Sequence, residues 1–217
     1  MKYAAVCFDL DGVIVDSESL HQAAFKAALN NYQLPLTARD YTAYFAGKTD
    51  QQGFNDYLSY MQAPINITDL LAIKQQAFIS FATDKLTYYK GVVTLIKHLA
   101  KVAPLALVTG SSPEETRIIL SANDIGRYFS ALVTASDVTY SKPNPEGYRL
   151  AASLLGESIP PEHCIAIEDS PSGVQAAKQA GMYCIAVTNT HTADLLYAAD
   201  AIVSQLELGA FTQLMDT

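Results

Sequence analysis

The sequence has little positive charge. Its 217 residues include 22 Asp and Glu but only 14 Lys and Arg, which leaves a formal net charge of −8 at pH 7. A chain with this balance does not attract nucleic acid or an anionic membrane surface through its overall field. If its substrate is an anion, binding must come from a metal ion and a few well-placed cations.

Cysteines are also few, and long apolar runs are missing. The three cysteines, Cys7, Cys164 and Cys184, all lie in apolar, strand-like stretches, which indicates buried free thiols in a reducing compartment. No apolar run is long enough to span a bilayer, and Lys2 leads directly into a strand-like stretch without a signal-peptide pattern. We therefore expect a cytoplasmic monomer with no membrane partner and no nucleic-acid partner.

Half of the residues are apolar, which is enough for a sizeable core in one large domain or in a domain with an insertion. From Gly91 onward, short apolar strands alternate with helix-like stretches. The strands are expected at residues 105–108, 132–134, 164–167, 184–187 and 201–203. This alternation predicts an α/β fold with a mostly parallel sheet and helices on both of its faces.

The region from residue 17 to about 83 follows a different pattern. Helix-like stretches cover residues 17–31, 40–45, 51–61 and 69–81, and no convincing strand lies among them. Pro64 and Asn66 mark a loop within this region. We interpret it as a helical insert in the α/β fold.

The most informative stretch is the end of the first predicted strand, where Val6-Cys7-Phe8 runs into Asp9-Leu10-Asp11-Gly12. Residues i and i+2 of an extended chain point the same way, so Asp9 and Asp11 project into one place. Gly12 lets the chain leave the strand and lets a ligand approach the backbone. Two carboxylates this close favour a bound cation or a shared proton. Taken alone, the motif is also typical of a solvated turn.

Polar clusters follow several predicted strands, at or near their C-terminal ends. They are Asp9 and Asp11; Thr109, Gly110 and Ser111; Lys142 and Pro143; and Glu168 and Asp169. In a parallel sheet these ends share one edge, so the clusters can converge. Carboxylates suit Mg²⁺, while a hydroxyl, a glycine amide and a lysine suit phosphate oxygens. One carboxylate remains to act as a nucleophile, and another can act as its acid–base partner. Together with the metal-binding and phosphate-binding groups, they indicate phosphoryl transfer through an aspartyl phosphate.

Each cluster also has a plain structural alternative. Thr109 could simply end a strand, and Lys142 could be an exposed loop lysine, which is the usual fate of lysine. Glu168 and Asp169 could begin a helix, where acidic residues are favoured. The functional interpretation therefore rests on the clusters taken together.

The clusters resemble the four signature motifs of the haloacid dehalogenase superfamily. The resemblance is carried, in the superfamily's order and across essentially the whole chain, by Phe8-Asp9-Leu10-Asp11-Gly12-Val13, Thr109-Gly110-Ser111, Lys142-Pro143 and Glu168-Asp169-Ser170. It is greatest to the branch with a small helical cap after the first strand, which includes β-phosphoglucomutase and sugar-phosphate phosphatases. It implies a Rossmann-like catalytic core of residues 1–15 and 85–217 and a helical cap domain of residues 16–84.

The resemblance implies catalytic roles. Asp9 would be the nucleophile that takes the phosphoryl group, and Asp11 would protonate the leaving group and then deprotonate the incoming acceptor. Lys142 would neutralise charge on Asp9 and on the phosphate. The motif Thr109-Gly110-Ser111 would hold phosphoryl oxygens.

The resemblance also implies a Mg²⁺ site. Asp9, Asp169 and the main-chain carbonyl of Asp11 would bind the ion. Glu168 would support it directly or through water.

Cap residues enter the predicted site on the resemblance alone. His21 and Lys74 fall where the mutase-like branch places residues near the active site, and Gly47-Lys48-Thr49 resembles the cap loop that meets the substrate. Alternatively, His21 is a packed or solvated helix histidine, and Lys74 is a solvated helix lysine.

The chain departs from the mutases of this branch at two places. Asp50 stands where they carry an arginine that grips a distal phosphate, and Ser112 and Pro113 stand where they carry a lysine and an asparagine. Both departures favour a phosphatase. We predict Mg²⁺-dependent hydrolysis of a small phosphorylated metabolite, such as a sugar phosphate.

Two alternatives stay open. One is a β-phosphoglucomutase-type mutase, because the chemistry up to the aspartyl phosphate is shared. The other is a non-catalytic phospho-acceptor or binding module similar to a response-regulator receiver, although the cap-sized insert and the Asp-x-Asp-Gly order argue against it.

Overall fold

The computed structural model describes residues 3–156, 159–209 and 211, and the chain divides into two compact units. One unit consists of two chain segments, the residues up to Asp16 and the residues from Thr87 onward. The other unit is Ser17–Leu86. We call them the core unit and the cap unit, and each is described by itself.

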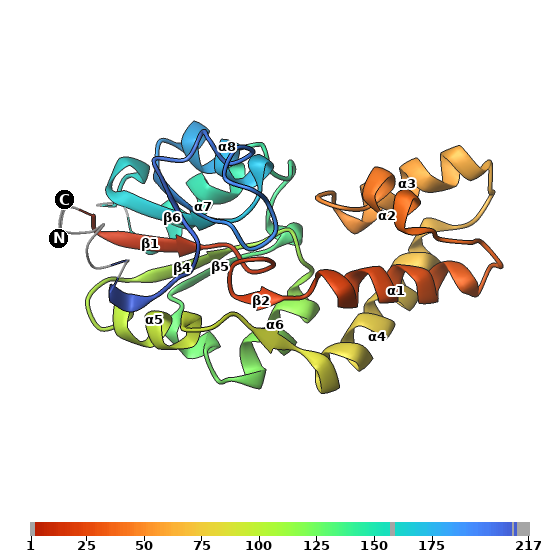
Figure 1. Ribbon diagram of the computed structural model, residues 1–217, viewed down its shortest axis with the longest axis horizontal. Helices are drawn as coiled ribbons and strands as arrows, with labels where there is room; N and C mark the ends of the chain where they lie inside the picture. The colour runs from red at the N-terminus through yellow and green to blue at the C-terminus, as the bar shows by residue number, and fades with distance from the viewer. Residues whose placement is uncertain (1–2, 157–158, 210, 212–217) are drawn as a thin grey trace. The chain divides into compact units, whose positions relative to one another are not determined.

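Within the described residues, the core unit is built on a six-stranded sheet (Figure 1). Its strands are β1 (Ala5–Phe8), β4 (Leu105–Val108), β5 (Ala131–Val133), β6 (Cys164–Glu168), β7 (Tyr183–Val187) and β8 (Ala201–Val203). They lie in the order β5-β4-β1-β6-β7-β8, and neighbours pair in parallel. The central strand β1 is buried along its whole length, which explains its unbroken apolar sequence. The predicted parallel α/β fold is confirmed.

Helices cover both faces of this sheet (Figure 1). α7 (Glu146–Leu155) and α8 (Pro171–Ala180) lie on one face, and α5 (Val92–Leu99) and α6 (Pro113–Ala122) lie on the other. Alternate strand residues form a buried cluster with α7 and α8, among them Cys7, Val108, Val133, Ala166 and Ala186. The residues between them, such as Phe8 and Leu107, are buried as well. Cys7, Cys164 and Cys184 are buried free thiols, as the sequence predicted.

Two core helices begin at the caps that their sequences indicate. In α6 the Ser112 hydroxyl accepts a hydrogen bond from the amide of Glu115 (3.3 Å), and the Glu115 carboxylate accepts one from the amide of Ser112 (3.3 Å). Ser170 caps α8, which ends at Gly181 in the left-handed conformation. Since α6 follows β4 and α8 follows β6, each helix begins directly after a polar cluster, Thr109–Ser111 for α6 and Glu168–Asp169 for α8.

The described residues of the cap unit form four helices, α1 (Glu18–Asn30), α2 (Ala38–Tyr44), α3 (Asp50–Met61) and α4 (Ile67–Lys85). The unit has a hydrophobic cluster of its own, rich in aromatic side chains. The ring of Phe25 lies 4.5 Å from that of Phe45 and 5.1 Å from that of Phe54, measured between centroids. This packing makes the insert a compact unit and confirms its helical character.

The sequence did not predict a small second sheet in the core unit. β2 (Val15–Asp16) pairs antiparallel with β3 (Thr87–Tyr88). Each strand has two residues, which is too short for an alternating pattern to show in the sequence. This pairing brings together the two places where the core unit is connected to the cap unit, before Ser17 and after Leu86.

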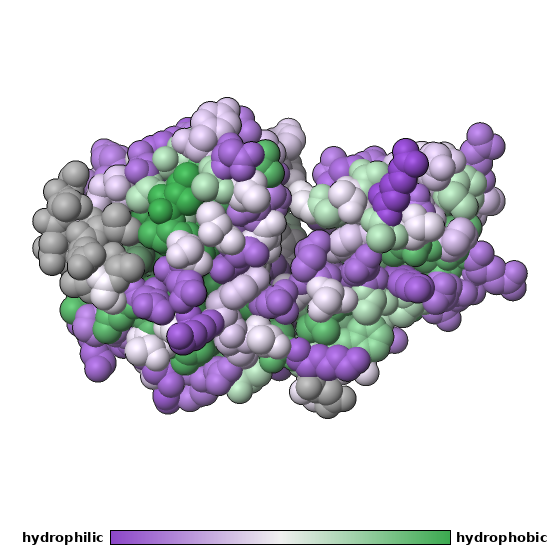
Figure 2. All heavy atoms as spheres, viewed as in Figure 1, coloured by the Kyte–Doolittle hydropathy of each residue, from purple (hydrophilic) through white to green (hydrophobic). Residues whose placement is uncertain are grey.

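On the face shown in Figure 2, hydrophilic residues predominate and apolar residues form small groups. Such scattered apolar residues are normal on a protein surface. In the ranges that the structure describes, no helix has both the length and the apolar character needed to cross a bilayer.

Candidate functional site

The predicted polar clusters of the core unit meet at one edge of the sheet. Phe8 of β1 lies beside Leu107 of β4 and beside Ile167 of β6 in parallel register. Shortly after these positions the three strands lead into Asp9, Thr109 and Glu168. Since the strands run in the same direction, groups far apart in the sequence are brought to one place.

Lys142 links all three of these strand ends. Its ammonium donates hydrogen bonds to Asp9 Oδ1 (2.5 Å), Glu168 Oε1 (2.7 Å) and the main-chain carbonyl of Val108 (2.9 Å). Its side chain is only 18% exposed, so the alternative of an exposed loop lysine is wrong. Burial alone would lower the pKa of Lys142, but the carboxylates of Asp9 and Glu168 raise it above its ordinary value. Lys142 is therefore a fixed cation.

Three buried carboxylates form a group at this edge. Asp9, Glu168 and Asp169 each offer one oxygen, and these atoms lie within 4.8 Å of one another. Burial raises the pKa of Asp9, against the attraction of Lys142, and the neighbouring acids raise it further. Burial and the charge of Glu168 raise the pKa of Asp169 to about 7. Carboxylates that are costly to ionise together favour a divalent cation, and a set of hard oxygen donors fits Mg²⁺.

Glu168 is completely buried and held from two sides. Its Oε1 accepts hydrogen bonds from Lys142 and from the Tyr148 hydroxyl (2.7 Å), and its Oε2 accepts one from the amide of Asp169 (3.1 Å). A Cβ on Gly173, in the first turn of α8, would lie 2.0 Å from Oε2. Glycine is therefore required there for the helix to pass this close to the carboxylate.

Asp11 is turned toward Ser111 and is not a member of the three-carboxylate group. The Ser111 hydroxyl donates to Asp11 Oδ2 (2.6 Å), and the Ser111 amide donates to Thr109 Oγ1 (3.0 Å). Thr109 and Ser111 are buried, whereas Gly110 between them is exposed and would have open space around a Cβ. The turn thus restrains the orientation of Asp11 and leaves Gly110 exposed at the strand end.

Gly12 allows the Asp9 strand end and Asp169 to approach each other. Its φ is 83°, in the left-handed region. A Cβ at this position would lie 1.9 Å from Asp169 Oδ2. Glycine is needed here twice, for the backbone conformation and for the space that the carboxylate occupies.

Residues 6–187 match the family described as haloacid dehalogenase-like hydrolase. The chain belongs to this family. It is 30% identical over 186 residues to the fructose-1-phosphate phosphatase YqaB of Escherichia coli (strain K12), covering 86% of this chain and 97% of that one. It is 28% identical over 206 residues to the validoxylamine A 7'-phosphate phosphatase of Streptomyces hygroscopicus subsp. limoneus, covering 94% of each.

Solved structures share the fold of this hydrolase. CbbY from Rhodobacter sphaeroides in complex with phosphate matches with a TM-score of 0.86 at 24% identity, over 97% of this chain and 99% of that chain. A β-phosphoglucomutase from Clostridium difficile matches with a TM-score of 0.83 at 20% identity, over 99% of this chain and 97% of that chain. The chain thus shares its fold with CbbY and with a β-phosphoglucomutase.

In the cap unit of this hydrolase, Lys74 is completely buried in α4. Its ammonium lies 2.7 Å from Asp50 Oδ2 at the start of α3 and 3.1 Å from His21 Nδ1 of α1. It also lies 5.1 Å from the ring centroids of both Phe25 and Phe78, and the His21 ring stacks on Phe78 at 4.3 Å. The alternative of a solvated Lys74 is therefore wrong, and His21 is a packed histidine with a specific partner.

The other predicted cap residues lie in the loop before α3. Gly47 is left-handed, with a φ of 72°, and would have open space around a Cβ. The ammonium of Lys48 lies 2.8 Å from the carboxylate of Asp56. That Gly47, Lys48, His21 and Lys74 meet the substrate stays a prediction.

Sequence reasoning missed several residues that contact the carboxylates or the Gly12 turn, namely Tyr148, Asn189, Thr190 and His191. Tyr148 lies within α7, where nothing in a helical pattern distinguishes it from other core residues. The other three follow β7 directly, so their position at a strand end is the signal that could have found them.

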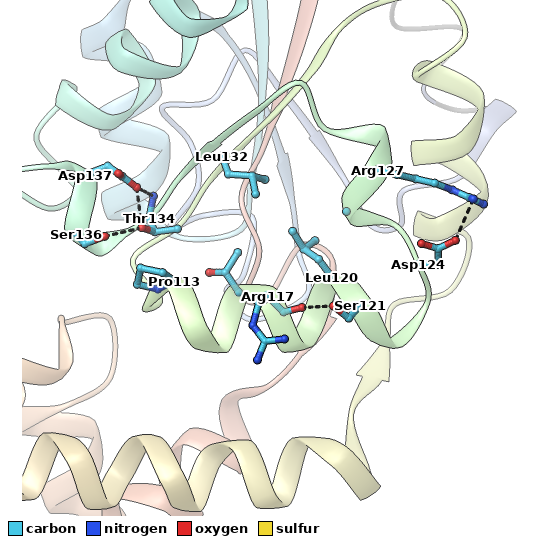
Figure 3. A pocket seen from close by; sticks show the side chains of 12 residues that line it. Pro113, Arg117, Leu120, Ser121, Asp124, Arg127, Leu132, Thr134, Ser136 and Asp137 are labelled. Carbon is cyan, nitrogen blue, oxygen red and sulfur yellow. Dashed lines mark hydrogen bonds and ion pairs between the residues drawn. The ribbon is translucent and has the colours of Figure 1, made fainter.

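A separate cavity of about 510 Å³ lies along α6 (Figure 3). Its lining residues include Pro113, Leu120, Arg127, Leu132 and Thr134. Among the described residues that line it, none belongs to the three-carboxylate group. Its arginines also have acidic neighbours, as in the pair of Arg127 with Asp124 at 3.0 Å (Figure 3). We do not include this cavity in the candidate site.

Proposed function

We propose that this hydrolase releases phosphate from a small phosphorylated metabolite, such as a sugar or polyol phosphate, through a Mg²⁺-dependent reaction at Asp9. The observation that carries the proposal is the position of Lys142, whose ammonium bridges Asp9 and Glu168 inside a group of buried carboxylates. The family and the phosphatases among its curated relatives make the chain a phosphoric monoester hydrolase.

The first chemical step transfers the phosphoryl group to the protein. A carboxylate oxygen of Asp9 attacks phosphorus, and the bond between phosphorus and the ester oxygen breaks. Asp11 gives its proton to that oxygen, so the leaving group departs as a neutral alcohol.

The second step returns the protein to its starting state. Asp11 accepts a proton from a water molecule while the water oxygen attacks phosphorus. The bond between phosphorus and Asp9 then breaks, inorganic phosphate leaves, and both carboxyl groups regain their original protonation.

The contacts of the two acids support different roles for them. Asp9 lies against the fixed cation of Lys142, which favours a carboxylate ready to attack and reduces its repulsion of the phosphate. Asp11 is held by the Ser111 hydroxyl instead and lies outside the three-carboxylate group. It can therefore exchange a proton with a substrate oxygen while Asp9 serves as nucleophile.

A divalent cation fits this arrangement. Asp9, Glu168 and Asp169 would hold Mg²⁺, with the main-chain carbonyl of Asp11 as a further oxygen ligand. When bound, the ion supplies positive charge that offsets the repulsion between the carboxylates and a phosphate dianion.

Hydrolysis is favoured over a mutase reaction by the ion pairs of the cap unit. A mutase of this branch needs a fixed cation for a second, distal phosphate, and the resemblance implies that Asp50 stands at the corresponding position here. Lys48 and Lys74 are the cap lysines that could replace that cation. Each already has a carboxylate at salt-bridge distance, Asp56 at 2.8 Å from Lys48 and Asp50 at 2.7 Å from Lys74. A second phosphate would have to compete with these carboxylates.

The names of the curated relatives indicate the class of substrate. They include phosphatases of fructose 1-phosphate, of validoxylamine A 7'-phosphate and of hexitol phosphates. Each of these substrates is a phosphomonoester of a polyhydroxylated carbon skeleton, and we propose the same class here.

The test is release of inorganic phosphate from a panel of sugar and polyol phosphates, with p-nitrophenyl phosphate as a generic substrate. We expect turnover with Mg²⁺ and none in EDTA. Turnover that persists in metal-free buffer would contradict the metal dependence. Failure to release phosphate from any monoester would favour the non-catalytic alternative.

The mutase alternative is tested separately. β-Glucose 1-phosphate is supplied with a trace of glucose 1,6-bisphosphate, and glucose 6-phosphate and free phosphate are followed together. We expect phosphate to appear and glucose 6-phosphate to form slowly or not at all. Faster formation of glucose 6-phosphate would overturn the proposal of a hydrolase that releases phosphate to water.

A further inference from the structure

A short polar segment after β7 contacts both chain segments that carry the carboxylates. It consists of Asn189, Thr190 and His191, and we call it the 189–191 segment. One of its side chains reaches Gly12, immediately after Asp11, and the other two reach Asp169. The two chemical steps proposed above give these residues no role, because none of them acts as a nucleophile or as a metal ligand in those steps.

Asn189 holds the turn after Asp11. Its side-chain amide Nδ2 donates a hydrogen bond to the main-chain carbonyl of Gly12 (2.7 Å). The amide of Gly12 donates to the carbonyl of Val15 (2.8 Å), so Gly12 is hydrogen-bonded through both its amide and its carbonyl. Gly12 has a left-handed φ of 83° and follows Asp11 directly in the chain. Asn189 thus restrains the backbone that carries Asp11.

Thr190 holds the carboxylate of Asp169. Its hydroxyl donates a hydrogen bond to Asp169 Oδ2. Gly12 also lies close to Oδ2, since a Cβ at this position would come within 1.9 Å of it. One oxygen of Asp169 is therefore held by Thr190 in a narrow space, which restrains the orientation of this member of the three-carboxylate group.

His191 completes the arrangement. Its Nδ1 lies 2.9 Å from Thr190 Oγ1 and 3.1 Å from the main-chain carbonyl of Asp169. A hydroxyl has a single proton, and that of Thr190 is used by Asp169 Oδ2. The contacts of His191 are satisfied when its Nδ1 carries a proton and donates it to both nearby oxygens. The histidine then fixes the direction in which the Thr190 hydroxyl donates.

We propose that Asn189 and Thr190 are positioning residues that hold the Asp11 backbone and the Asp169 carboxylate in the geometry that Mg²⁺ binding requires. The inference rests on the metal-dependent function proposed above, but it concerns metal affinity and not the chemical step. Partners that orient a metal ligand commonly change affinity about 10–100-fold when they are removed. Neither residue would touch the reacting phosphate.

The test measures metal binding directly, with Mn²⁺ as the probe. Binding of Mn²⁺ to the purified full-length protein is followed by electron paramagnetic resonance, and Mg²⁺ is then titrated as a competitor. We expect Thr190→Val to weaken Mn²⁺ and Mg²⁺ binding about 10–100-fold. Thr190→Ser keeps the hydroxyl and is expected to bind both ions nearly as tightly as the wild-type protein.

Thr192→Val is the matched control. It makes the same chemical change two residues further along, at an exposed position that touches none of the carboxylates in the described structure. We expect no change in its metal affinity. Equal weakening in Thr190→Val and Thr192→Val would overturn the proposal, because any change in the loop would then suffice.

A second readout separates positioning from general stability. The melting temperature of each variant in EDTA reports the fold without metal, and we expect it to be nearly unchanged in Thr190→Val. At saturating Mg²⁺, kcat should recover most of its wild-type value while the Mg²⁺ concentration for half-maximal activity stays raised. Unchanged metal affinity in a folded Thr190→Val would overturn the inference.

Asn189→Ala provides a variant at the other contact, should Thr190→Val fail to fold. It is expected to weaken Mn²⁺ binding about 10-fold, at the lower end of the range for such partners. Wild-type affinity in this variant would overturn the role of Asn189.

The two proposals fail in different ways. A wild-type protein that binds Mn²⁺ but releases no phosphate contradicts the proposed function and leaves this inference standing. If the wild-type protein shows Mg²⁺-dependent turnover but the variants bind metal normally, the proposed function stands and the positioning role of Asn189 and Thr190 is contradicted.

Discussion

The ammonium of Lys74 is wholly buried in the cap unit and lies 2.7 Å from the carboxylate of Asp50. In the mutases that the chain resembles, an arginine stands at the position of Asp50. Here the same position carries the opposite charge, and that charge neutralises a buried lysine. The contact therefore offsets a buried charge in the cap unit, and it is one of the ion pairs on which the proposal of a phosphatase rests.

Asp50→Ala should destabilise the cap unit by about 2–4 kcal/mol, because it removes the carboxylate that lies 2.7 Å from the buried ammonium of Lys74. The free energy of unfolding in urea and amide exchange in α1 and α4 would measure the loss. Asp56→Ala is the matched control, since the Lys48–Asp56 pair is partly exposed, with side chains 29% and 43% exposed. Loss of such a pair should cost at most about 1 kcal/mol. Equal effects of the two substitutions would contradict the prediction.

Lys142→Ala should lower kcat/KM by several orders of magnitude, and Lys142→Arg should restore little. The ammonium uses its three N–H bonds on two carboxylates and a carbonyl, a geometry that a planar guanidinium does not reproduce. Removing it should cost about 3–5 kcal/mol of transition-state stabilisation, by analogy with unpairing a buried charge. Lys97→Ala, at an exposed position of α5, is the control that should keep normal kinetics. Near-normal kinetics in Lys142→Ala would remove Lys142 from the site.

Asp9→Asn and Asp11→Asn should fail at different steps. The Asp9 variant should form no phosphoenzyme, because an amide is not a nucleophile. The Asp11 variant should accumulate the aspartyl phosphate when the substrate has a good leaving group such as p-nitrophenolate, because no base then activates water. Intact-protein mass spectrometry after rapid quenching would detect the added phosphoryl group. Wild-type turnover in the Asp9 variant would show that the nucleophile lies elsewhere.

Gly12→Ala should remove metal binding and activity together. Its Cβ would lie 1.9 Å from Asp169 Oδ2, and its φ of 83° disfavours any other residue. Gly181→Ala is the matched control, because Gly181 is also left-handed (φ 93°) but has open space around a Cβ. That control should lose only about 1–2 kcal/mol of stability to backbone strain and keep its metal affinity. Normal Mn²⁺ binding in folded Gly12→Ala would show that the contact with Asp169 is unimportant.

Much of the core unit was predictable because its signals are local. The strand at residues 105–108 is bounded as its apolar run indicates, and the α6 capping box follows from the spacing of Ser112 and Glu115. The convergence of Asp9, Thr109, Lys142 and Glu168 followed from their places at or near strand ends, since parallel strands bring their carboxyl ends to one edge. The motif order alone was therefore enough to identify the family.

Other features were decided by tertiary structure alone. Whether Lys74 is solvated or buried depends on how α1, α3 and α4 pack, and no periodicity in α4 shows that Asp50 and His21 will meet it. The two-residue strands β2 and β3 exist because they pair with each other, so neither has a pattern of its own.

The sequence by itself determined the parallel α/β architecture, the helical insert and the acidic and basic groups available for phosphoryl transfer, because hydrophobic period, helix caps and motif order are properties of short stretches. Only the tertiary structure decided which oxygen each group faces. Asp11 turns to Ser111, Tyr148 holds Glu168, and Thr190 holds Asp169, although no sequence spacing relates these partners. Contacts of this kind depend on the relative positions of separate strands and helices, which are set when the whole core packs.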